Sequence, residues 1–543
     1  MYKPELKNTE PVEFVLDEFS RGYAQCVDNN WNYAIYARNP NVSIFQNEYN
    51  AGYIQGKVQG NKTIIAARNN TWRNFTLDAT AGRELSCEIP PQGVEIAQAA
   101  LAENYNYLYK WIGNRTDDAK TIGIKRMMFK MLGIYDGAAD NPQRKDITYA
   151  DLNLSAMPAE QSLMHVGDQQ LTFIDIYFIN AQMDLFDAVA DKLGAQINLL
   201  ELDDEKKKLS YRPSHCSAFV HMLDNGDIYW AHTSWACFYA MSCAVTYVVG
   251  DDFLTQNCYC QGQFGSNTDF GFNGHGIGFN ETTETFFYNE SKTAGVWLTW
   301  RAAAAENFAR SIDEFWDYVT LDNTGTYLNG YMIVDAYRNE FALIDMSYAR
   351  FAMMRGNGKE LKVTDSTGYT PTFLDYDHNL VSSTHIVGCN IPTYKRIWHE
   401  LQTIDGAPKR RYQLFTNMNR VTDLDAAKML ITFNSDNEPI SIAGRWDYGY
   451  GTSEFLRARA HGAIDSKAFG TRQMRDVLDK ISLEPDINGT KTSFEMKYGT
   501  PYISGRPFIW SKSLFAPFKQ SSDIDCVPDA LDGRWNPVKM FMK

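Results

Sequence analysis

The sequence predicts an α+β fold, and three observations indicate it. Short runs are rich in β-branched and aromatic residues, longer runs have apolar residues at helical spacing, and the two kinds alternate along all 543 residues. Hydrophobic residues make up 44% of the chain and charged residues 22%, which is ordinary for a globular protein with a large core. Internal repeats and low-complexity tracts are absent from the sequence.

The first 215 residues form a mixed segment of strands and helices. Residues 13–20 and 31–37 are strand-like runs. A charged stretch at 201–209 predicts a solvated loop, where an exposed cleavage region would be tolerated. Between them, three runs predict helices: 94–112, 122–132 and 174–193.

Residues 216–235 predict a β-hairpin with a thiol, Cys216, at its first position. The pair Asn225-Gly226 lies between two runs of apolar, aromatic and β-branched residues. Asn-Gly favours a tight turn because both central residues of a type I′ turn need positive φ. The hairpin therefore aligns Cys216 with a partner strand.

Two registers of this hairpin are open. A two-residue turn places Cys216 opposite Trp235 and points His232 to the other face. A three-residue loop closed by a glycine bulge shifts the pairing by one, so that His232 lies opposite Ala218 on the face of the thiol. Cys216 itself could equally be a small buried apolar residue or half of a disulfide.

Beyond the hairpin, helices and strands continue to alternate. Residues 235–249 predict a buried core helix, and 301–318 an alanine-rich helix. Residues 260–278 are glycine-rich but lack the strand-loop-helix frame of a phosphate-binding loop, so they predict loop and turn. Residues 325–335 predict a buried strand, with 341–346 pairing back on it.

Charge and targeting signals limit the classes of partner. The net charge of -14 disfavours a nucleic-acid partner, which needs a basic surface. The start of the chain shows no signal peptide, and no window is long enough to span a membrane. Nine Asn-x-Ser/Thr sequons predict glycosylation in a luminal compartment. They are at Asn41, Asn61, Asn69, Asn74, Asn114, Asn153, Asn280, Asn289 and Asn488.

The cysteines leave room for one reactive thiol, because an odd number cannot all pair in disulfides within one chain. No His-Glu-x-x-His pattern is present, and Cys258-Tyr259-Cys260 lacks zinc-finger spacing. We therefore expect neither a metal nor another cofactor. The nine cysteines are Cys26, Cys87, Cys216, Cys237, Cys243, Cys258, Cys260, Cys389 and Cys526.

The run Cys216-Ser217-Ala218, followed by Ala-His-Thr-Ser-Trp at 231–235, resembles the nucleophile region of the phospholipase B-like family. Members of that family are lysosomal and secreted proteins of the N-terminal nucleophile (Ntn) hydrolase class. Further segments match the family in the same order: 50–56, 325–335, 390–392, 423–425, 441–445, 461–467 and 507–511. Two of them depart from the family pattern. Gln55 replaces an acidic residue in the first, and Leu328 and Gly330 differ from the family in the second.

The resemblance implies a fold and a maturation step. The fold would be an αββα sandwich, with two antiparallel sheets between helical layers. The chain would be cut between His215 and Cys216. Residues 1–215 would then remain as a noncovalent subunit that completes the fold, and 216–543 would be the catalytic segment.

It also implies the chemistry of Cys216. A cut at this point frees an α-amine with a pKa of roughly 7.7 to 8.0, against about 8.5 for a thiol, so one residue supplies both nucleophile and base. Asn390 would donate an N–H to the oxyanion, with a backbone N–H or Trp235 as further donor or wall. His232 could orient a water or the thiol.

A basic residue near the site follows a proline in the family. Counting back from Phe415 selects Arg411, whereas counting forward from Pro408 selects Lys409. Arg411 could hold a substrate carboxylate or phosphate through two hydrogen bonds, and a solvated loop is the alternative.

The expected substrate is a small acyl compound with an ester or linear amide bond, either a phospholipid or an N-acyl compound. A luminal lipid-binding or ligand-binding protein that keeps the fold without turnover is one alternative. A papain-like Cys-His protease is another, and it would need a separate histidine and no cut before Cys216. The expected location is lysosomal or secreted.

Overall fold

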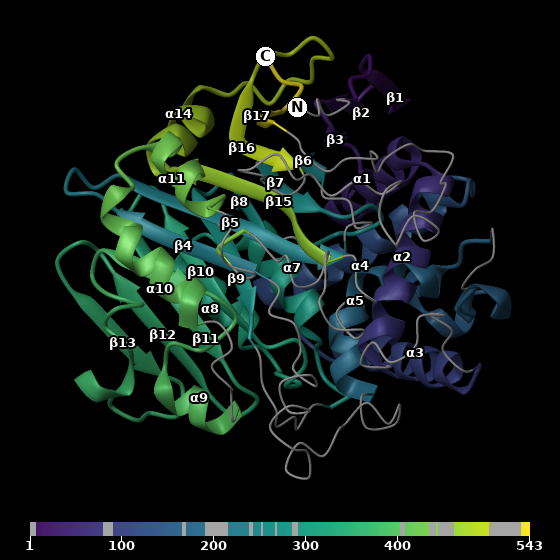
Figure 1. The fold of residues 1–543 in the computed structure, drawn as a ribbon. Helices are drawn as coiled ribbons and strands as arrows, with labels where there is room; N and C mark the ends of the chain where they lie inside the picture. Colours follow the sequence, from purple (N-terminus) through teal and green to yellow (C-terminus); the bar gives the residue numbers. More distant parts are fainter. Residues whose placement is uncertain are drawn as a thin grey trace, which may run out of the picture.

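Two β-sheets pack face to face in the computed structural model, with helices on both outer sides (Figure 1). This arrangement confirms the predicted α+β sandwich. The structure describes residues 7–79, 91–165, 170–189, 216–237, 243–250, 254–265, 269–284, 292–401, 408–433, 441–443, 461–498 and 534–543.

The larger sheet has eleven strands in the order β1-β2-β3-β6-β7-β8-β9-β10-β11-β12-β13. All neighbours are antiparallel except β3 and β6, which run parallel. The strands are β1 Val12–Asp17, β2 Ser20–Val27, β3 Asn30–Ala37, β6 Cys243–Val249, β7 Leu254–Tyr259, β8 Phe270–Asn273, β9 Ile277–Thr283, β10 Asn329–Asp335, β11 Glu340–Met346, β12 Phe351–Gly356 and β13 Leu361–Asp365.

The smaller sheet is antiparallel throughout, in the order β14-β4-β5-β15-β16-β17. Its strands β4 and β5 pack on β9 and β10 of the larger sheet. The strands are β4 Cys216–Met222, β5 Ile228–Cys237, β14 His385–Gly388, β15 His461–Gly470, β16 Thr492–Tyr498 and β17 Trp535–Lys539.

Helices cover the outer face of each sheet. α1, α7 and α8 contact the larger sheet, while α10, α11 and α14 contact the smaller one. The α-helices are α1 Ile44–Gln59, α2 Asn61–Ala79, α3 Pro91–Gly113, α4 Ala119–Ala138, α5 Phe173–Val189, α7 Leu298–Phe308, α8 Ile312–Val319, α9 Lys395–Leu401, α10 Pro408–Asn417, α11 Leu424–Ile431 and α14 Thr471–Lys480.

Side-chain alternation along β10 shows the two packed faces. The ring of Tyr331 packs at a tilt against that of Phe315 of α8, with ring centroids 5.4 Å apart. The next residue, Met332, approaches Gly388 of the smaller sheet. Because successive side chains of a strand point to opposite faces, the core lies on both sides of the larger sheet.

The segment 50–56, one of the family matches, lies inside α1. Its glycines allow α1 to cross α4 at backbone contact. A Cβ on Gly52 would lie 2.0 Å from the carbonyl oxygen of Lys130. Gln55 is buried there, and its Nε2 donates to the carbonyl of Gln263 at 2.7 Å.

Several sequence predictions are confirmed: the strands near 13–20 and 31–37, the helices over 94–112 and 122–132, and the pairing of β10 with β11. The predicted helix at 174–193 is α5, of which the structure describes residues up to 189.

The core helix predicted over 235–249 was wrong, because its described parts are the end of β5 and all of β6. A short continuous apolar run has no period that separates a buried strand from a buried helix, and β6 is rich in β-branched residues. Residues 301–318 form two helices, with Ser311 capping α8 through the backbone N–H of Glu314. Residues 270–273 and 277–278 are strand instead of loop.

The segment 1–215 shares a sheet with the rest of the chain. Its strands β1 to β3 extend the larger sheet, and the parallel pairing of β3 with β6 joins the two parts. Among the residues that the structure describes, no helix combines the length and apolar character that crossing a membrane requires.

The sequons differ in accessibility. Asn41, Asn114 and Asn488 are exposed. Asn280 is fully buried on β9, and its Nδ2 donates to the carbonyl of Ala231 at 3.2 Å. The predicted glycosylation at Asn280 is therefore incompatible with the packed sheets. Asn289 lies outside the described residues, as does His215 of the predicted cut.

Candidate active site

The β4–β5 hairpin adopts the three-residue loop. Cys216 pairs with Ser234 and Ala218 pairs with His232. Gly226 closes the loop with φ 85°, the left-handed conformation that a glycine bulge requires. His232 therefore shares the face of the thiol, which was the second of the two predicted registers.

Cys216 is a free buried thiol next to a carboxyl and an imidazole. Its Sγ lies 3.6 Å from Oδ2 of Asp269, and the same oxygen lies 4.0 Å from Nε2 of His232. Asp269 immediately precedes β8, so the packing of the two sheets brings it to the first residue of β4. Sequence reasoning missed Asp269, since no local motif marks it.

These three residue types are also donors that Zn²⁺ accepts, and their ligand atoms lie within 4.8 Å of one another. Cys216, His232 and Asp269 could therefore hold a metal, although the sequence spacing predicted no metal site. The donor set fits both a metal centre and a hydrolytic site. The bonds to the backbone of Cys216 favour the hydrolytic site.

Side chains bind both backbone polar atoms of Cys216. The N–H of Cys216 donates to Oδ1 of Asn390 at 2.9 Å, and its carbonyl accepts from Nη1 of Arg410 at 2.5 Å. Asn390 also donates through Nδ2 to the carbonyl of Thr283 at 2.7 Å. Its φ of 66° is one that asparagine tolerates better than most residues. Asn390 thus contacts the backbone of Cys216, and its role as an oxyanion donor stays a prediction.

The arginine at Cys216 is Arg410, one position from the predicted Arg411. Arg410 is fully buried, and Nη1 also donates to Oγ of Ser217 at 2.9 Å. Its guanidinium lies over the ring of Trp235 at 4.3 Å. Arg411 instead lies near the carboxyls of Glu284 and Asp345, and the side chain of Lys409 is outside the described part of the chain.

Trp235 contributes to the site in two ways. Its backbone N–H forms a hydrogen bond with the Cys216 sulfur. Its side chain points to the opposite face of the sheet from His232, as strand alternation requires, and stacks on Arg410.

A second carboxyl lies behind Asp269. The carboxyl of Glu281 of β9 lies against that of Asp269 and accepts a hydrogen bond from the hydroxyl of Tyr327 at 2.9 Å. Burial and the mutual repulsion of the two carboxyls raise the pKa of Glu281, and burial also raises the pKa of Asp269. The pair therefore retains a proton between its two carboxyls.

A buried cation completes the cluster. Lys467 of β15 donates from Nζ to Oδ1 of Asp465 at 2.5 Å and to Oγ of Ser234 at 2.6 Å. That hydroxyl lies 3.4 Å from Nδ1 of His232. Asp465 and Lys467 lie in the sequence block 461–467, whose match carried no assigned role.

The surroundings raise the pKa of the Cys216 thiol and lower the pKa of the His232 imidazole. Burial, with the charges of Asp269 and Glu281, raises the pKa of Cys216. Burial and the charge of Lys467 lower the pKa of His232 well below its ordinary value. At neutral pH the cluster therefore holds a neutral thiol and a neutral imidazole.

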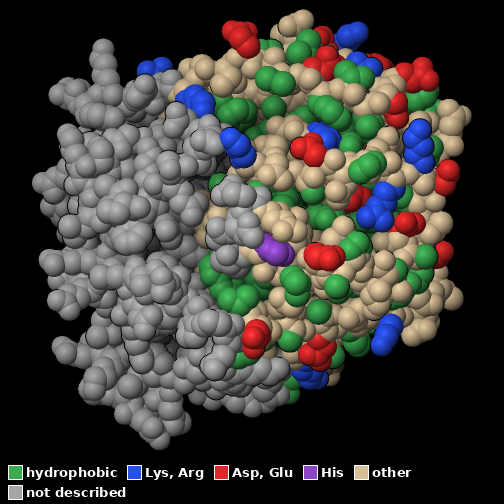
Figure 2. Space-filling model, turned by 90° about the vertical axis from the view of Figure 1, so that its right-hand side faces the viewer, with side chains coloured by type: hydrophobic (Ala, Val, Ile, Leu, Met, Phe, Trp, Pro, Cys, Tyr) green, Lys and Arg blue, Asp and Glu red, His purple; other side chains and the backbone are tan. Residues whose placement is uncertain are grey.

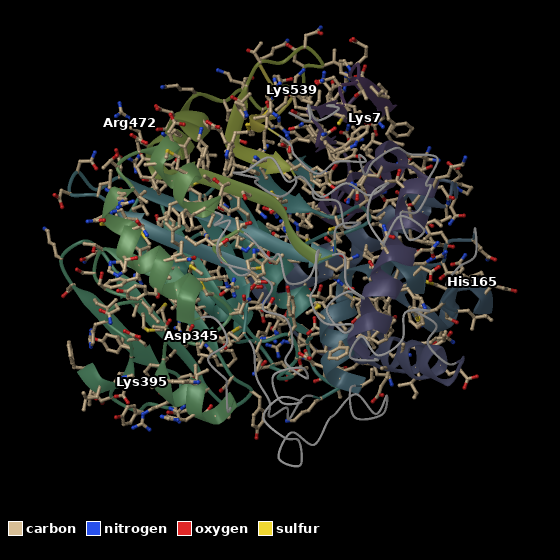
Figure 3. The ribbon with its side chains drawn as sticks, viewed as in Figure 1. Lys7, His165, Asp345, Lys395, Arg472 and Lys539 are labelled. Carbon is tan, nitrogen blue, oxygen red and sulfur yellow. The ribbon has the colours of Figure 1, made fainter. Side chains whose placement is uncertain are left out.

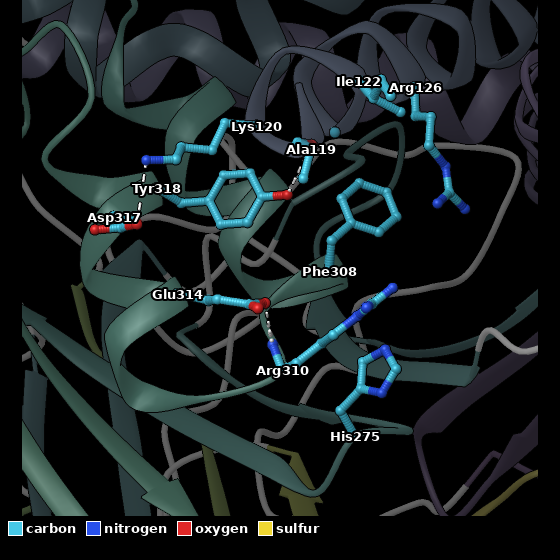
Figure 4. A pocket seen from close by; sticks show the side chains of 11 residues that line it. Ala119, Lys120, Ile122, Arg126, His275, Phe308, Arg310, Glu314, Asp317 and Tyr318 are labelled. Carbon is cyan, nitrogen blue, oxygen red and sulfur yellow. Dashed lines mark hydrogen bonds and ion pairs between the residues drawn. The ribbon is translucent and has the colours of Figure 1, made fainter. Parts of the chain in front are cut away.

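A surface cavity of about 460 Å³ lies elsewhere, between α4, α7, α8 and the turn at His275 (Figure 4). Two of its acidic groups have partners: Asp317 pairs with Lys120 at 3.1 Å, and Glu314 accepts the backbone N–H of Arg310 at 2.9 Å. None of its lining residues belongs to the Cys216 cluster. On the face shown in Figure 2, the described acidic and basic side chains are interspersed.

A family model and several known proteins match the chain. The family model described as phospholipase B matches residues 159–524, more than half of the chain. Phospholipase B-like protein C of Dictyostelium discoideum is 23% identical over 558 residues, covering 91% of this chain and 87% of that protein. Phospholipase B-like 1 of Rattus norvegicus is 26% identical over 293 residues, covering 49% of each chain.

Phospholipase B of Crotalus adamanteus is 25% identical over 305 residues, covering 49% of this chain and 51% of that protein. The match to Phospholipase B-like protein B of Dictyostelium discoideum, at 23% identity, covers 67% of this chain and 63% of that protein. Apart from protein C, the chain thus spans between about half and two thirds of the length of these relatives.

Proposed function

This chain belongs to the phospholipase B family, and from that premise we propose that it is a hydrolase in which Cys216 removes acyl groups from lipid substrates. The observation that carries the proposal is the set of bonds around Cys216. Its nitrogen is bound by Asn390, its carbonyl by Arg410 and its thiol by Asp269. A cysteine that only fills space needs no such partners.

The proposed nucleophile is formed by a cut between His215 and Cys216. The new α-amine would accept the thiol proton, since its pKa of roughly 7.7 to 8.0 lies close to that of a thiol. Oδ1 of Asn390 already accepts a hydrogen from this nitrogen. After the cut it would continue to orient the amine towards the sulfur.

His232 is the alternative base, because it lies on the face of the thiol. It would make the protein a Cys-His hydrolase that needs no cut. Its pKa, however, is well below the ordinary value because of burial and the charge of Lys467. A base with a strongly lowered pKa is a weak proton acceptor. We therefore assign the base to the α-amine and an orienting role to His232.

The acyl step forms a bond between Sγ and the acyl carbon and breaks the bond to the alcohol or amine, which takes the proton from the base. Water then hydrolyses the thioester and releases the acid. Asn390 has two N–H bonds on Nδ2, of which the carbonyl of Thr283 accepts one. We assign the other to the developing oxyanion. The cation Arg410 lies close enough to offset its charge.

The substrate class is an acyl ester or a linear amide of a phospholipid or N-acyl compound, with Arg411 as a candidate anchor for its phosphate or carboxylate. The proposed location is lysosomal or secreted, which exposed sequons such as Asn41 support. The segments 1–215 and 216–543 would stay together after the cut, because they share the larger sheet.

The test is the release of fatty acid from phospholipid vesicles and from an N-acyl amide. Wild type should hydrolyse at least one of them, and Cys216→Ala should not. Cys26→Ala changes another buried thiol, on β2, and should retain the activity. If neither substrate is hydrolysed and a thiol-directed acyl probe leaves Cys216 unlabelled, the binding-protein alternative replaces this proposal.

A further inference from the structure

Asp345 of β11, labelled in Figure 3, binds the segment that carries Asn390. Its Oδ2 accepts the backbone N–H groups of Thr393 at 2.6 Å and Tyr394 at 2.7 Å. Asp345 is 1% exposed. These two bonds hold the chain three and four residues after Asn390.

Glu284 lies beside Asp345. It directly follows β9, is 2% exposed, and its carboxyl lies against the carboxyl of Asp345. A hydrogen bond between two carboxyls requires a proton on one of them. Because Asp345 accepts two backbone N–H bonds, which favour its charged form, the proton belongs on Glu284. Burial raises the pKa of both groups, that of Asp345 to about 6.

The carboxyl pair Glu284–Asp345 closes a ring of contacts around Asn390. Thr283, next to Glu284, accepts the Nδ2 hydrogen bond of Asn390. Asp345 holds the same segment through Thr393. The shared proton therefore joins the two groups that fix Asn390, one on its side chain and one on its backbone.

We propose that the proton shared by Glu284 and Asp345 positions Asn390, and through it the backbone of Cys216, for the reaction. Both acids are positioning residues, and the proposal rests on the proposed function of Cys216. Loss of the proton would leave two negative charges within hydrogen-bonding distance in a buried place. Their repulsion would displace Glu284 with Thr283, or Asp345 with Thr393, and either shift loosens Asn390.

The groups that face the two carboxyls compensate little of the charge that loss of the proton would leave. Among the described residues, Arg411 of α10 is the cation that faces both carboxyls, and it offsets only part of their repulsion. From β10 the position facing the pair is Gly330, one of the departures from the family block. A Cβ there would lie 3.3 Å from Oδ1 of Asp345 and 3.4 Å from Oε1 of Glu284. The pair is therefore ordered at acidic pH and loosens as the pH rises.

Hydrogen exchange of a peptide covering 389–394 tests this without substrate. After correction for the intrinsic exchange rate, wild type should lose protection by about tenfold per pH unit above the transition. Glu284→Gln donates a hydrogen bond without titrating, so its protection should not change with pH. Asp345→Asn should lower protection at every pH, because an amide replaces the carboxylate that accepts both N–H bonds.

Glu360→Gln changes an exposed acid and should behave as wild type, and peptides from β10 should stay protected in all variants. In an active preparation, Glu284→Gln should also extend activity to higher pH. Constant wild-type protection from pH 5 to 8, or equal pH dependence in Glu284→Gln, would overturn the proposal. Since the exchange needs no turnover, a failure of hydrolysis leaves this result standing, and the reverse also holds.

Discussion

The side-chain oxygen of Asn390 lies 2.9 Å from the backbone nitrogen of Cys216. Both residues are buried, and the other end of the same amide is bound to Thr283 at the end of β9. One side chain thus ties the first residue of β4 in the smaller sheet to the larger sheet. The position of Cys216, the proposed nucleophile, depends on this contact between sheets.

We expect Asn390→Ala to reduce kcat/KM by about 100-fold to 1000-fold, since it removes the proposed oxyanion donor. It should also lower the free energy of unfolding by about 1 to 3 kcal/mol, because it leaves the carbonyl of Thr283 buried without a donor. Fatty-acid release and urea unfolding measure the two effects. A variant within threefold of wild-type activity would contradict the role of Asn390.

Arg410→Lys should reduce kcat/KM by about tenfold or more. Lysine is a point charge and does not reproduce a guanidinium that binds Cys216, Ser217 and Asn390 at once. Arg411→Gln is the comparison variant from the same helix. It should raise KM more than it lowers kcat if Arg411 holds a substrate anion. A larger loss of kcat in Arg411→Gln than in Arg410→Lys would reverse the two assignments.

In helix α10, counting residues from a family motif does not identify which basic residue contacts Cys216. The motif indicated a basic residue after Pro408, and α10 does place one at Cys216. Which of three consecutive basic residues points inwards depends on packing against Trp235 and Ser217, which lie 175 and 193 positions away. Flanking residues carry no information about that packing.

Asp269→Asn should separate thiol reactivity from catalysis. The charge of Asp269 raises the pKa of Cys216, so its removal should speed alkylation of the thiol by iodoacetamide about threefold or more at neutral pH. Hydrolysis should fall over the same pH range, because the thiol loses its orienting acceptor. Slower alkylation, or unchanged hydrolysis, would show that Asp269 does not act on the thiol.

Asp269 itself was not predictable from the sequence, because it reaches Cys216 only through the packing of β8 and β9 against β4. The hairpin was easier to predict from the sequence. Asn225-Gly226 identified its loop, yet both a type I′ turn and a glycine bulge suit that pair. The observed pairing of Cys216 with Ser234 selects the bulge and brings His232 to the thiol.

Asp184 should make stability depend on pH. This residue of α5 accepts the first N–H groups of α7, from Leu298 at 2.9 Å and Thr299 at 3.0 Å, and burial raises its pKa from 3.8 to about 6. Because the folded state binds the proton of Asp184 more tightly than the unfolded state does, the raised pKa stabilises the fold at pH values below the unfolded pKa. This contribution is lost as the pH rises through the folded pKa of about 6. The loss is about 3 kcal/mol.

Urea unfolding between pH 4 and pH 7 measures this pH-dependent loss of stability. Asp184→Asn should remove this part of the pH dependence, whereas Asp140→Asn, which changes an exposed acid, should keep it. Equal slopes in wild type and Asp184→Asn would contradict the assignment.

The most direct test of the account is a denaturing mass measurement of purified protein held at acidic and at neutral pH, beside Cys216→Ala. We predict two fragments, the larger beginning at Cys216, and a single intact chain for the variant. A wild-type chain that hydrolyses lipid while it stays intact at every pH would contradict the account, because Cys216 would then act without a free α-amine.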